Sequence, residues 1–138
     1  LPLRVERHCS NAQKIAEYLN AHEKVSHVNY AGLPEDKYHA LAQKYLTRGF
    51  GGVLSFKLKG SAEKADKFID SLQLISHLAN VGDAKTLIIH PATTTHEQLS
   101  PEDKVTAGVF PGLLRLSVGI EHIDDIKADL EQALAAAK

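Results

Sequence analysis

The chain has 138 residues, of which 43% are hydrophobic and 24% charged, and its formal net charge is −1 at pH 7. These values are typical of one globular domain with one core, and the interspersed charges argue against a nucleic-acid-binding surface. No apolar run approaches the roughly 20 residues of a membrane span, and the single cysteine excludes an internal disulfide and favours the reducing cytoplasm.

The first half of the chain predicts a helix, a strand, a second helix and a second strand. Apolar periodicity over residues 11–25 indicates the first helix, and the β-branched stretch 25–34 indicates a strand that ends at a turn. Residues 35–46 form the second predicted helix, and the glycine-bounded stretch 49–60 contains a half-buried strand. The residues expected to face the core are Ala12, Ile15, Ala16, Leu19, Tyr38, Leu41, Ala42, Tyr45, Leu54, Phe56 and Leu58.

The middle of the chain predicts its longest helix. Ser61 is a suitable N-cap, and we expect the helix to cover residues 61–80 and to end at Gly82. Residues 86–90 predict a buried strand, and the polar, turn-rich stretch 91–103 predicts a surface loop. The expected core residues of the long helix are Ala65, Phe68, Ile69, Leu72 and Ile75.

The C-terminal part predicts one more strand, over residues 112–118, and a final helix. That helix begins near His122 and carries Asp124 and Asp125 in its first turn, where acidic side chains are favourable. Its expected core residues are Ile123, Ile126, Leu130 and Leu134. Together these elements predict a single domain over residues 1–138, an α/β two-layer sandwich. We expect a sheet of about four strands, mostly antiparallel, with helices packed on one face.

Arg115 stands out because it lies within an apolar strand. Apolar side chains alternate onto one face of this strand, whereas Arg115 and Ser117 share the other face. A guanidinium group stays charged and matches the two oxygens of a carboxylate, so Arg115 is a candidate carboxylate clamp. Two alternatives are an arginine on an edge strand, lying over the sheet, and an arginine paired with an acid such as Glu121.

Other polar residues are weaker candidates. The side-chain amide of Asn80 could donate to an anion, but Asn also favours an ordinary helix C-terminus. His90 and His96 flank a loop without the spacing of a metal site, and residues 93–95 are expected to cap a turn rather than line a pocket. Neither a catalytic triad nor paired carboxylates stand out, so we assign no catalytic residue and no metal ligand.

Several stretches together resemble one family of enzymes. They are LRVERHCSNA, YAGLP, GGVLSF, ISHLANVGDAKTLIIHPATTTHEQL and GLLRLSVGIEHIDDIKADLEQAL. In this order they are similar to the C-terminal domain of the pyridoxal-phosphate enzymes of cysteine and methionine metabolism, and most similar to O-acetylhomoserine sulfhydrylases. The sister cystathionine γ-synthases, cystathionine β-lyases and methionine γ-lyases typically carry a Ser-Leu-Gly-Gly-type stretch at residues 80–83, where this chain has Asn-Val-Gly-Asp.

The resemblance implies the C-terminal domain of a fold-type I pyridoxal-phosphate transferase and roles for three residues. Arg115 would grip the α-carboxylate of the amino-acid substrate, Asn80 would make a second contact to it, and Thr95 would support the arginine. The implied reaction replaces the acetoxy group of O-acetylhomoserine with sulfide or a thiol, giving homocysteine or methionine. Pyridoxal phosphate serves that chemistry as an electron sink.

The resemblance also implies what the chain lacks. No lysine lies in the family's Ser-x-Thr-Lys-like context, so these residues alone are expected to be inactive and to bind no cofactor. Because the chain has no Met, we expect it to be part of a longer protein, with its own N-terminal cofactor domain as a partner. That protein would be a cytoplasmic homotetramer, acting on a small amino acid and binding neither nucleic acid nor membrane.

Two alternatives stay open. One is a cystathionine γ-synthase- or methionine γ-lyase-like enzyme. The other is a free-standing module of the same fold that binds an amino acid or mediates assembly. We expect a domain of the enzyme to expose apolar surface for its cofactor domain, whereas an independent module would present a polar surface.

Overall fold

The computed structural model describes residues 1–138 as helices around one five-stranded sheet with the strand order β1-β2-β5-β4-β3. The strands are β1 (Val25–Asn29), β2 (Val53–Leu58), β3 (Ser76–His77), β4 (Leu87–Ile89) and β5 (Leu113–Ser117). The helices are α1 (Pro2–Ala21), α2 (His39–Tyr45), α3 (Glu63–Ser71), α4 (Pro101–Thr106), α5 (Ile123–Ala136) and a 3₁₀ turn, η1 (Pro91–Thr93). No helix is long and apolar enough to cross a bilayer.

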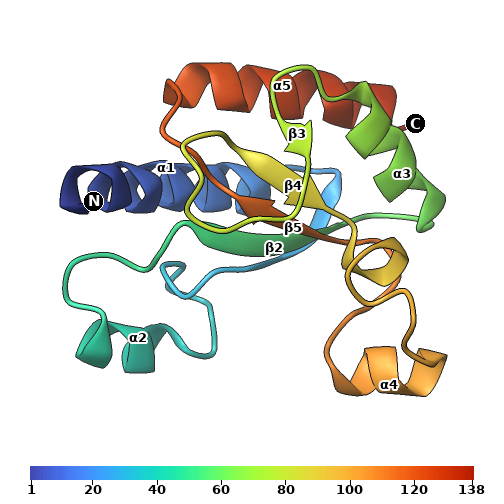
Figure 1. Ribbon diagram of the computed structural model, residues 1–138, viewed down its shortest axis with the longest axis horizontal. Coiled ribbons are helices and arrows are strands. Elements are labelled where there is room, and N and C mark those ends of the chain that lie inside the picture. Colours follow the sequence, from blue (N-terminus) through green and yellow to red (C-terminus); the bar gives the residue numbers. More distant parts are fainter.

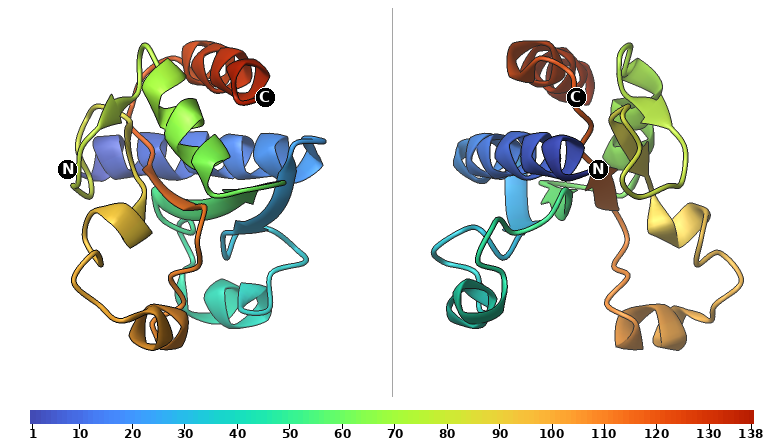
Figure 2. Two further views of the ribbon diagram at one scale, coloured as in Figure 1. Left: turned by 90° about the vertical axis from the view of Figure 1, so that its right-hand side faces the viewer. Right: turned by 60° about the vertical axis from the view of Figure 1, so that its left-hand side comes forward.

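Three helices form one layer on the sheet. Helices α1, α3 and α5 lie on the same face, whereas α2 and α4 lie on the opposite side, away from the strands (Figures 1 and 2). The alternation of the central strands explains the core between sheet and helix layer, because every second side chain points towards the helices. Those core residues are Leu54, Phe56, Leu58, Leu114 and Leu116, each at most 5% exposed.

Helices α1 and α5 of this layer confirm their predicted apolar stripes. In α1, Ala12, Ile15, Ala16 and Leu19 are all fully buried, although the helix begins nine residues before the predicted range. In α5, Ile126, Leu130 and Leu134 are buried and Ile123 packs at the edge of the core. The helix begins at Ile123, close to the predicted start, and the imidazole Nδ1 of His122 caps it by accepting the Asp124 N–H at 3.3 Å.

The predicted helix over residues 61–80 is wrong beyond Ser71, where α3 ends. The chain turns there because the carboxylate of Asp129, on α5, accepts the backbone N–H groups of Gln73, Leu74 and Ile75 at 2.8–2.9 Å. These bonds replace the ones that a continuing helix would have made. Ile75 is still buried, but in the bend that precedes β3 rather than in a helix.

The residues after that turn form the strand β3, which pairs parallel with β4. The other three strand pairs are antiparallel. The sheet is therefore mixed and five-stranded, and the expectation of about four strands is wrong because β3 was assigned to a helix. The α/β class and the helix layer on one face are as predicted.

Two further elements differ from the sequence-based expectation. In α2 only Ala42 is buried, whereas Tyr38, Leu41 and Tyr45 are 54–67% exposed, because this short helix lies away from the sheet. The expected loop 91–103 contains η1 and the start of α4. Ser100 caps α4, since its Oγ accepts the Asp103 N–H at 3.1 Å, as Ser does at helix starts.

Candidate functional site

Arg115 lies in the middle of β5, the central strand of the sheet. Its register partners are Ser55 on β2 and Ile89 on β4. Its neighbours Leu114 and Leu116 are fully buried under the helix layer, so Arg115 faces the opposite side, which we call the open face of the sheet. The alternative of an arginine on an edge strand is wrong.

The guanidinium of Arg115 has few partners. Its Nη2 donates to the main-chain oxygen of Asn80 at 3.3 Å, and its Nε is buried without a hydrogen-bond partner. No ion pair of the structure includes Arg115. The alternative pairing with Glu121 is wrong, because both carboxylate oxygens of Glu121 accept hydrogen bonds from Thr86. A half-buried cation with unfilled donors suits a carboxylate ligand.

Asn80 lies in the loop between β3 and β4, and not at a helix end as the sequence suggested. Its side-chain Oδ1 accepts the Val81 N–H at 2.8 Å, and its Nδ2 donates to Asp83 Oδ2 at 3.3 Å. These bonds close the loop on itself. The structure therefore brings Asn80 to Arg115 through the main-chain oxygen, while the amide group is used within the loop.

Thr95 is not joined to Arg115 or Asn80 by any hydrogen bond. Its exposed hydroxyl lies 2.8 Å from His96 Nδ1. The neighbouring hydroxyls of Thr93 and Thr94 donate to the main-chain oxygen of His90 at 3.3 and 2.8 Å. These two bonds confirm the expected capping role for Thr93 and Thr94 but not for Thr95, whose hydroxyl makes no bond to the turn.

A polar row on the open face escaped the sequence-based analysis. Asn29 Nδ2 donates to Ser55 Oγ at 3.1 Å, and Asn29 Oδ1 lies 2.7 Å from His27 Nε2. Ser55 is also the register partner of Arg115, so the row ends beside the guanidinium. The alternation of Ser55 and Lys57 on β2 was the available signal, but sequence alone did not show that β2 and β5 are neighbours.

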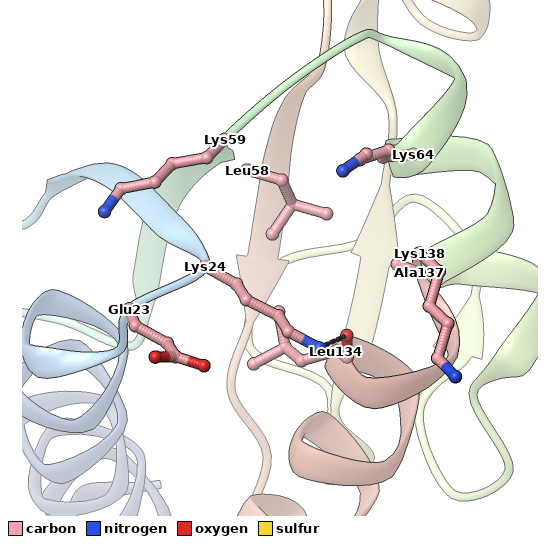
Figure 3. Close-up of a pocket in the computed structure, with 8 residues that line it drawn as sticks. All are labelled: Glu23, Lys24, Leu58, Lys59, Lys64, Leu134, Ala137 and Lys138. Atoms are coloured by element: carbon pink, nitrogen blue, oxygen red, sulfur yellow. Dashed lines mark hydrogen bonds between the residues drawn. The ribbon is translucent and has the colours of Figure 1, made fainter.

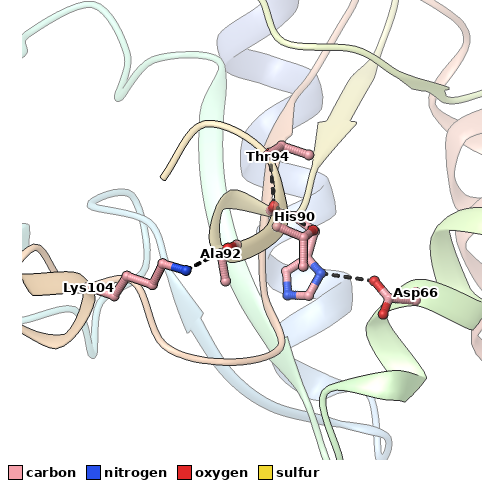
Figure 4. A network of polar contacts seen from close by, with 6 residues as sticks. Asp66, His90, Ala92, Thr94 and Lys104 are labelled. Atoms are coloured by element: carbon pink, nitrogen blue, oxygen red, sulfur yellow. Dashed lines mark hydrogen bonds and ion pairs between the residues drawn. The ribbon is translucent and has the colours of Figure 1, made fainter. Parts of the chain in front are cut away.

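His90 is held by structural contacts. Its buried Nδ1 lies 3.0 Å from Asp66 Oδ1 on α3, and its main-chain oxygen closes the η1 turn (Figure 4). Lys104 Nζ donates to the Ala92 oxygen of the same turn at 3.1 Å. No group of three or more His, Cys, Asp or Glu side chains is placed to hold a metal ion.

A second polar region is the lysine-lined hollow of about 260 Å³ near the end of α5, bounded by Glu23, Lys24, Leu58, Lys59, Lys64, Leu134, Ala137 and Lys138 (Figure 3). Lys24 Nζ donates to the main-chain oxygen of Leu134 at 2.8 Å. A cation at this position satisfies a carbonyl of the last helical turn. Lys24 therefore has a structural role at the end of α5. The hollow includes neither Arg115 nor Asn80, so it is separate from the candidate carboxylate site.

Comparison with known proteins defines the family. The family model of Cys/Met metabolism PLP-dependent enzymes matches residues 1–135. The chain belongs to this family. Members of the Cys/Met metabolism family depend on pyridoxal phosphate, and the resemblance noted from the motifs is thereby confirmed.

Named relatives within the family are sulfhydrylases and homocysteine synthases. O-acetyl-L-homoserine sulfhydrylase of Leptospira meyeri is 59% identical over 135 residues, which are 97% of this chain and 30% of that protein. Homocysteine synthase of Schizosaccharomyces pombe is 55% identical over 137 residues, which are 99% of this chain and 32% of that protein. The chain thus spans about a third of the length of these relatives.

Solved structures of the family share the fold. A Campylobacter jejuni protein named as an O-acetylhomoserine (thiol)-lyase, which carries N′-pyridoxyl-lysine-5′-monophosphate, is 45% identical with a TM-score of 0.93 over 97% of this chain and 32% of its own. Cystathionine γ-synthase of Xanthomonas oryzae pv. oryzae, in complex with cystathionine, is 38% identical with a TM-score of 0.91 over 99% of this chain and 35% of its own.

Proposed function

We propose that this chain is the C-terminal, substrate-carboxylate-binding domain of an O-acetylhomoserine sulfhydrylase. That enzyme replaces the acetoxy group of O-acetylhomoserine with sulfide or a thiol and forms homocysteine or methionine. The observation that carries the carboxylate-binding role is the buried Nε of Arg115, which has no partner on the open face of the sheet. The names of relatives that are 55–59% identical support the choice of reaction.

The chain's own residues would bind and orient the substrate. Arg115 presents parallel N–H groups that can hold both oxygens of an α-carboxylate, and the Asn80 carbonyl fixes one arm of the guanidinium at 3.3 Å. Asn80 Nδ2 would make a second contact to the α-carboxylate, and Thr95 would support the arginine. Asn80 must exchange its bond to Asp83 to donate to the substrate. Pyridoxal phosphate, when bound, supplies the electron sink for the exchange at the γ-carbon.

The open face suits a partner domain of the same protein. Exposed apolar side chains lie on and beside α2 and α4, on the side of the sheet that carries Arg115; they are Tyr38, Leu41, Tyr45, Leu46, Leu99, Val105 and Phe110. The absence of a helix layer on this side is consistent with coverage by an N-terminal cofactor domain, which would hold the ring, phosphate and Schiff-base lysine. We further propose a homotetramer in the cytoplasm.

Cystathionine γ-synthase activity is the second candidate, because the structure of such an enzyme superposes with a TM-score of 0.91. The two activities differ in the incoming sulfur nucleophile. The full-length enzyme is therefore assayed with O-acetylhomoserine and either sulfide or cysteine. We expect faster formation of homocysteine from sulfide; faster formation of cystathionine from cysteine would reverse the assignment.

The role of Arg115 is tested in the same full-length enzyme. Loss of a charge-assisted, two-pronged contact should cost about 2–4 kcal/mol in transition-state binding, so Arg115→Ala should lower kcat/KM for O-acetylhomoserine about 30- to 1000-fold. Arg115→Lys keeps the positive charge but not the forked geometry, so its kcat/KM should lie between those of the unmodified enzyme and Arg115→Ala. Lys67→Ala, which removes an exposed charge from α3, is the control; equal effects of Arg115→Ala and Lys67→Ala would refute a specific clamp.

A further inference from the structure

A polar cluster joins the strand that carries Arg115 to the loop that carries Asn80. Glu121 Oε1 accepts the main-chain N–H of Thr86 at 2.6 Å, and Glu121 Oε2 accepts the Thr86 hydroxyl proton at 2.7 Å. The Thr86 Oγ1 in turn accepts the Gly119 N–H at 2.9 Å. Thr86 is fully buried and Glu121 half-buried, so these bonds lie largely out of water.

Other contacts close the same cluster. The Ile120 N–H donates to the Ala84 oxygen at 2.9 Å. Asn11 Nδ2, on α1, donates to the main-chain oxygens of Gly119 and Glu121 at 3.1 and 3.0 Å. A Cβ at position 119 would lie 2.6 Å from Thr86 N and closer still to the Glu121 carboxylate. Only glycine fits there, which shows how tightly the three segments meet.

The cluster lies between Arg115 and the loop that carries Asn80. Residues 118–121 continue directly from β5, which holds Arg115. Thr86 ends the loop of residues 78–86, and the other end of that loop is fixed by the Leu78 N–H, which donates to the Ile88 oxygen at 3.2 Å. Asn80 lies between these two anchors, so a shift at Thr86 changes where the loop meets the guanidinium.

We propose that Glu121 is a positioning residue for the carboxylate site, an inference that rests on the proposed function of Arg115. Glu121 does not touch the substrate. Through Thr86 it sets the position of the Asn80 loop relative to β5. Because Thr86 engages both carboxylate oxygens, Glu121 is also kept from pairing with Arg115, and the guanidinium stays available for the substrate.

The test compares steady-state kinetics of the full-length holoenzyme and its variants. We expect Glu121→Ala and Thr86→Val to raise the KM for O-acetylhomoserine about tenfold, while kcat and the KM for sulfide stay within about twofold. Glu121→Gln and Thr86→Ser retain part of the bonding and should restore most of the affinity. If Glu121→Ala fails to fold, these conservative variants together with Thr86→Val decide the question.

Asp129 provides a matched control, because it is another carboxylate that accepts backbone N–H groups of a loop. Its loop, residues 73–75, carries none of the proposed site residues. Asp129→Asn should lower thermal stability and leave the KM for O-acetylhomoserine unchanged. In hydrogen–deuterium exchange, Glu121→Ala should increase exchange in residues 78–86 and Asp129→Asn in residues 72–76.

The outcomes separate this inference from the proposed function. If Arg115→Ala raises KM and Glu121→Ala does not, Glu121 is not a positioning residue and the assignment of Arg115 stands. If Arg115→Ala has no effect, the proposed function fails and this inference fails with it. Equal changes of KM in Glu121→Ala and Asp129→Asn would also overturn it, because they would reflect general loss of stability.

Discussion

The two faces of the sheet differ although the same strands form both. Towards the helix layer, Phe56 and Leu114 are fully buried and form the core with residues of α1, α3 and α5. On the open face, Ser55 and Arg115 alternate with them and are only half-buried. Strand alternation thus separates a face that stabilises the fold from a face that can bind a ligand. Neighbouring residues of one strand should therefore respond very differently to substitution.

The largest effect is expected for Phe56→Ala on the core face. Phe56 is fully buried and packs edge-to-face against Phe68, with ring centroids 5.9 Å apart. Removal of the ring should lower the free energy of unfolding by about 3–5 kcal/mol, measured by urea denaturation. The adjacent substitution Ser55→Ala, on the open face, should change it by about 0.5 kcal/mol or less. Similar losses for the two variants would contradict the division between the faces.

A medium effect is expected for Tyr30→Phe. The buried phenol donates to the Gly51 oxygen at 2.9 Å, and burial raises the pKa of Tyr30 above its usual value of about 10. Loss of the hydrogen bond should cost about 1 kcal/mol at pH 7. Above about pH 10 the unfolded chain releases a proton that the folded chain retains, so stability falls as pH rises.

The pH dependence of stability isolates the contribution of Tyr30. In denaturation series from pH 7 upward, Tyr30→Phe should show a shallower alkaline decline than the unmodified protein. Part of the decline should remain, because burial and the hydrogen bond to Glu131 also raise the pKa of Tyr18. An unchanged slope in Tyr30→Phe would show that this phenol does not contribute.

The smallest effect is expected for Leu41→Ser on α2. Leu41 is 54% exposed on the open side of the molecule, so its loss should change the free energy of unfolding by less than about 0.5 kcal/mol. Leu130→Ser, in the fully buried stripe of α5, should cost several kcal/mol. If urea denaturation gives comparable losses, α2 packs more closely on this chain than its exposure indicates.

Elements with strong local patterns were predictable. The stripes of α1 and α5 and the alternation of β2 and β5 follow from helix and strand periodicity, which depends on residues close in sequence. The end of α3 was not predictable, because Asp129 is 54–56 residues away from the N–H groups that it binds. The sequence of α2 has helical apolar periodicity, but periodicity does not reveal whether another element covers the apolar side chains.

The candidate site shows the same division. From the sequence came Arg115 on the face away from the core, the NVGD stretch and the family resemblance. The tertiary structure placed β5 at the centre of the sheet, brought the Asn80 carbonyl rather than its amide to Arg115, and engaged Glu121 with Thr86. Alternation is a local property of an extended backbone, so sequence alone fixes which side chains share a face. Strand order and loop anchoring depend on contacts between distant residues, which only the folded chain brings together.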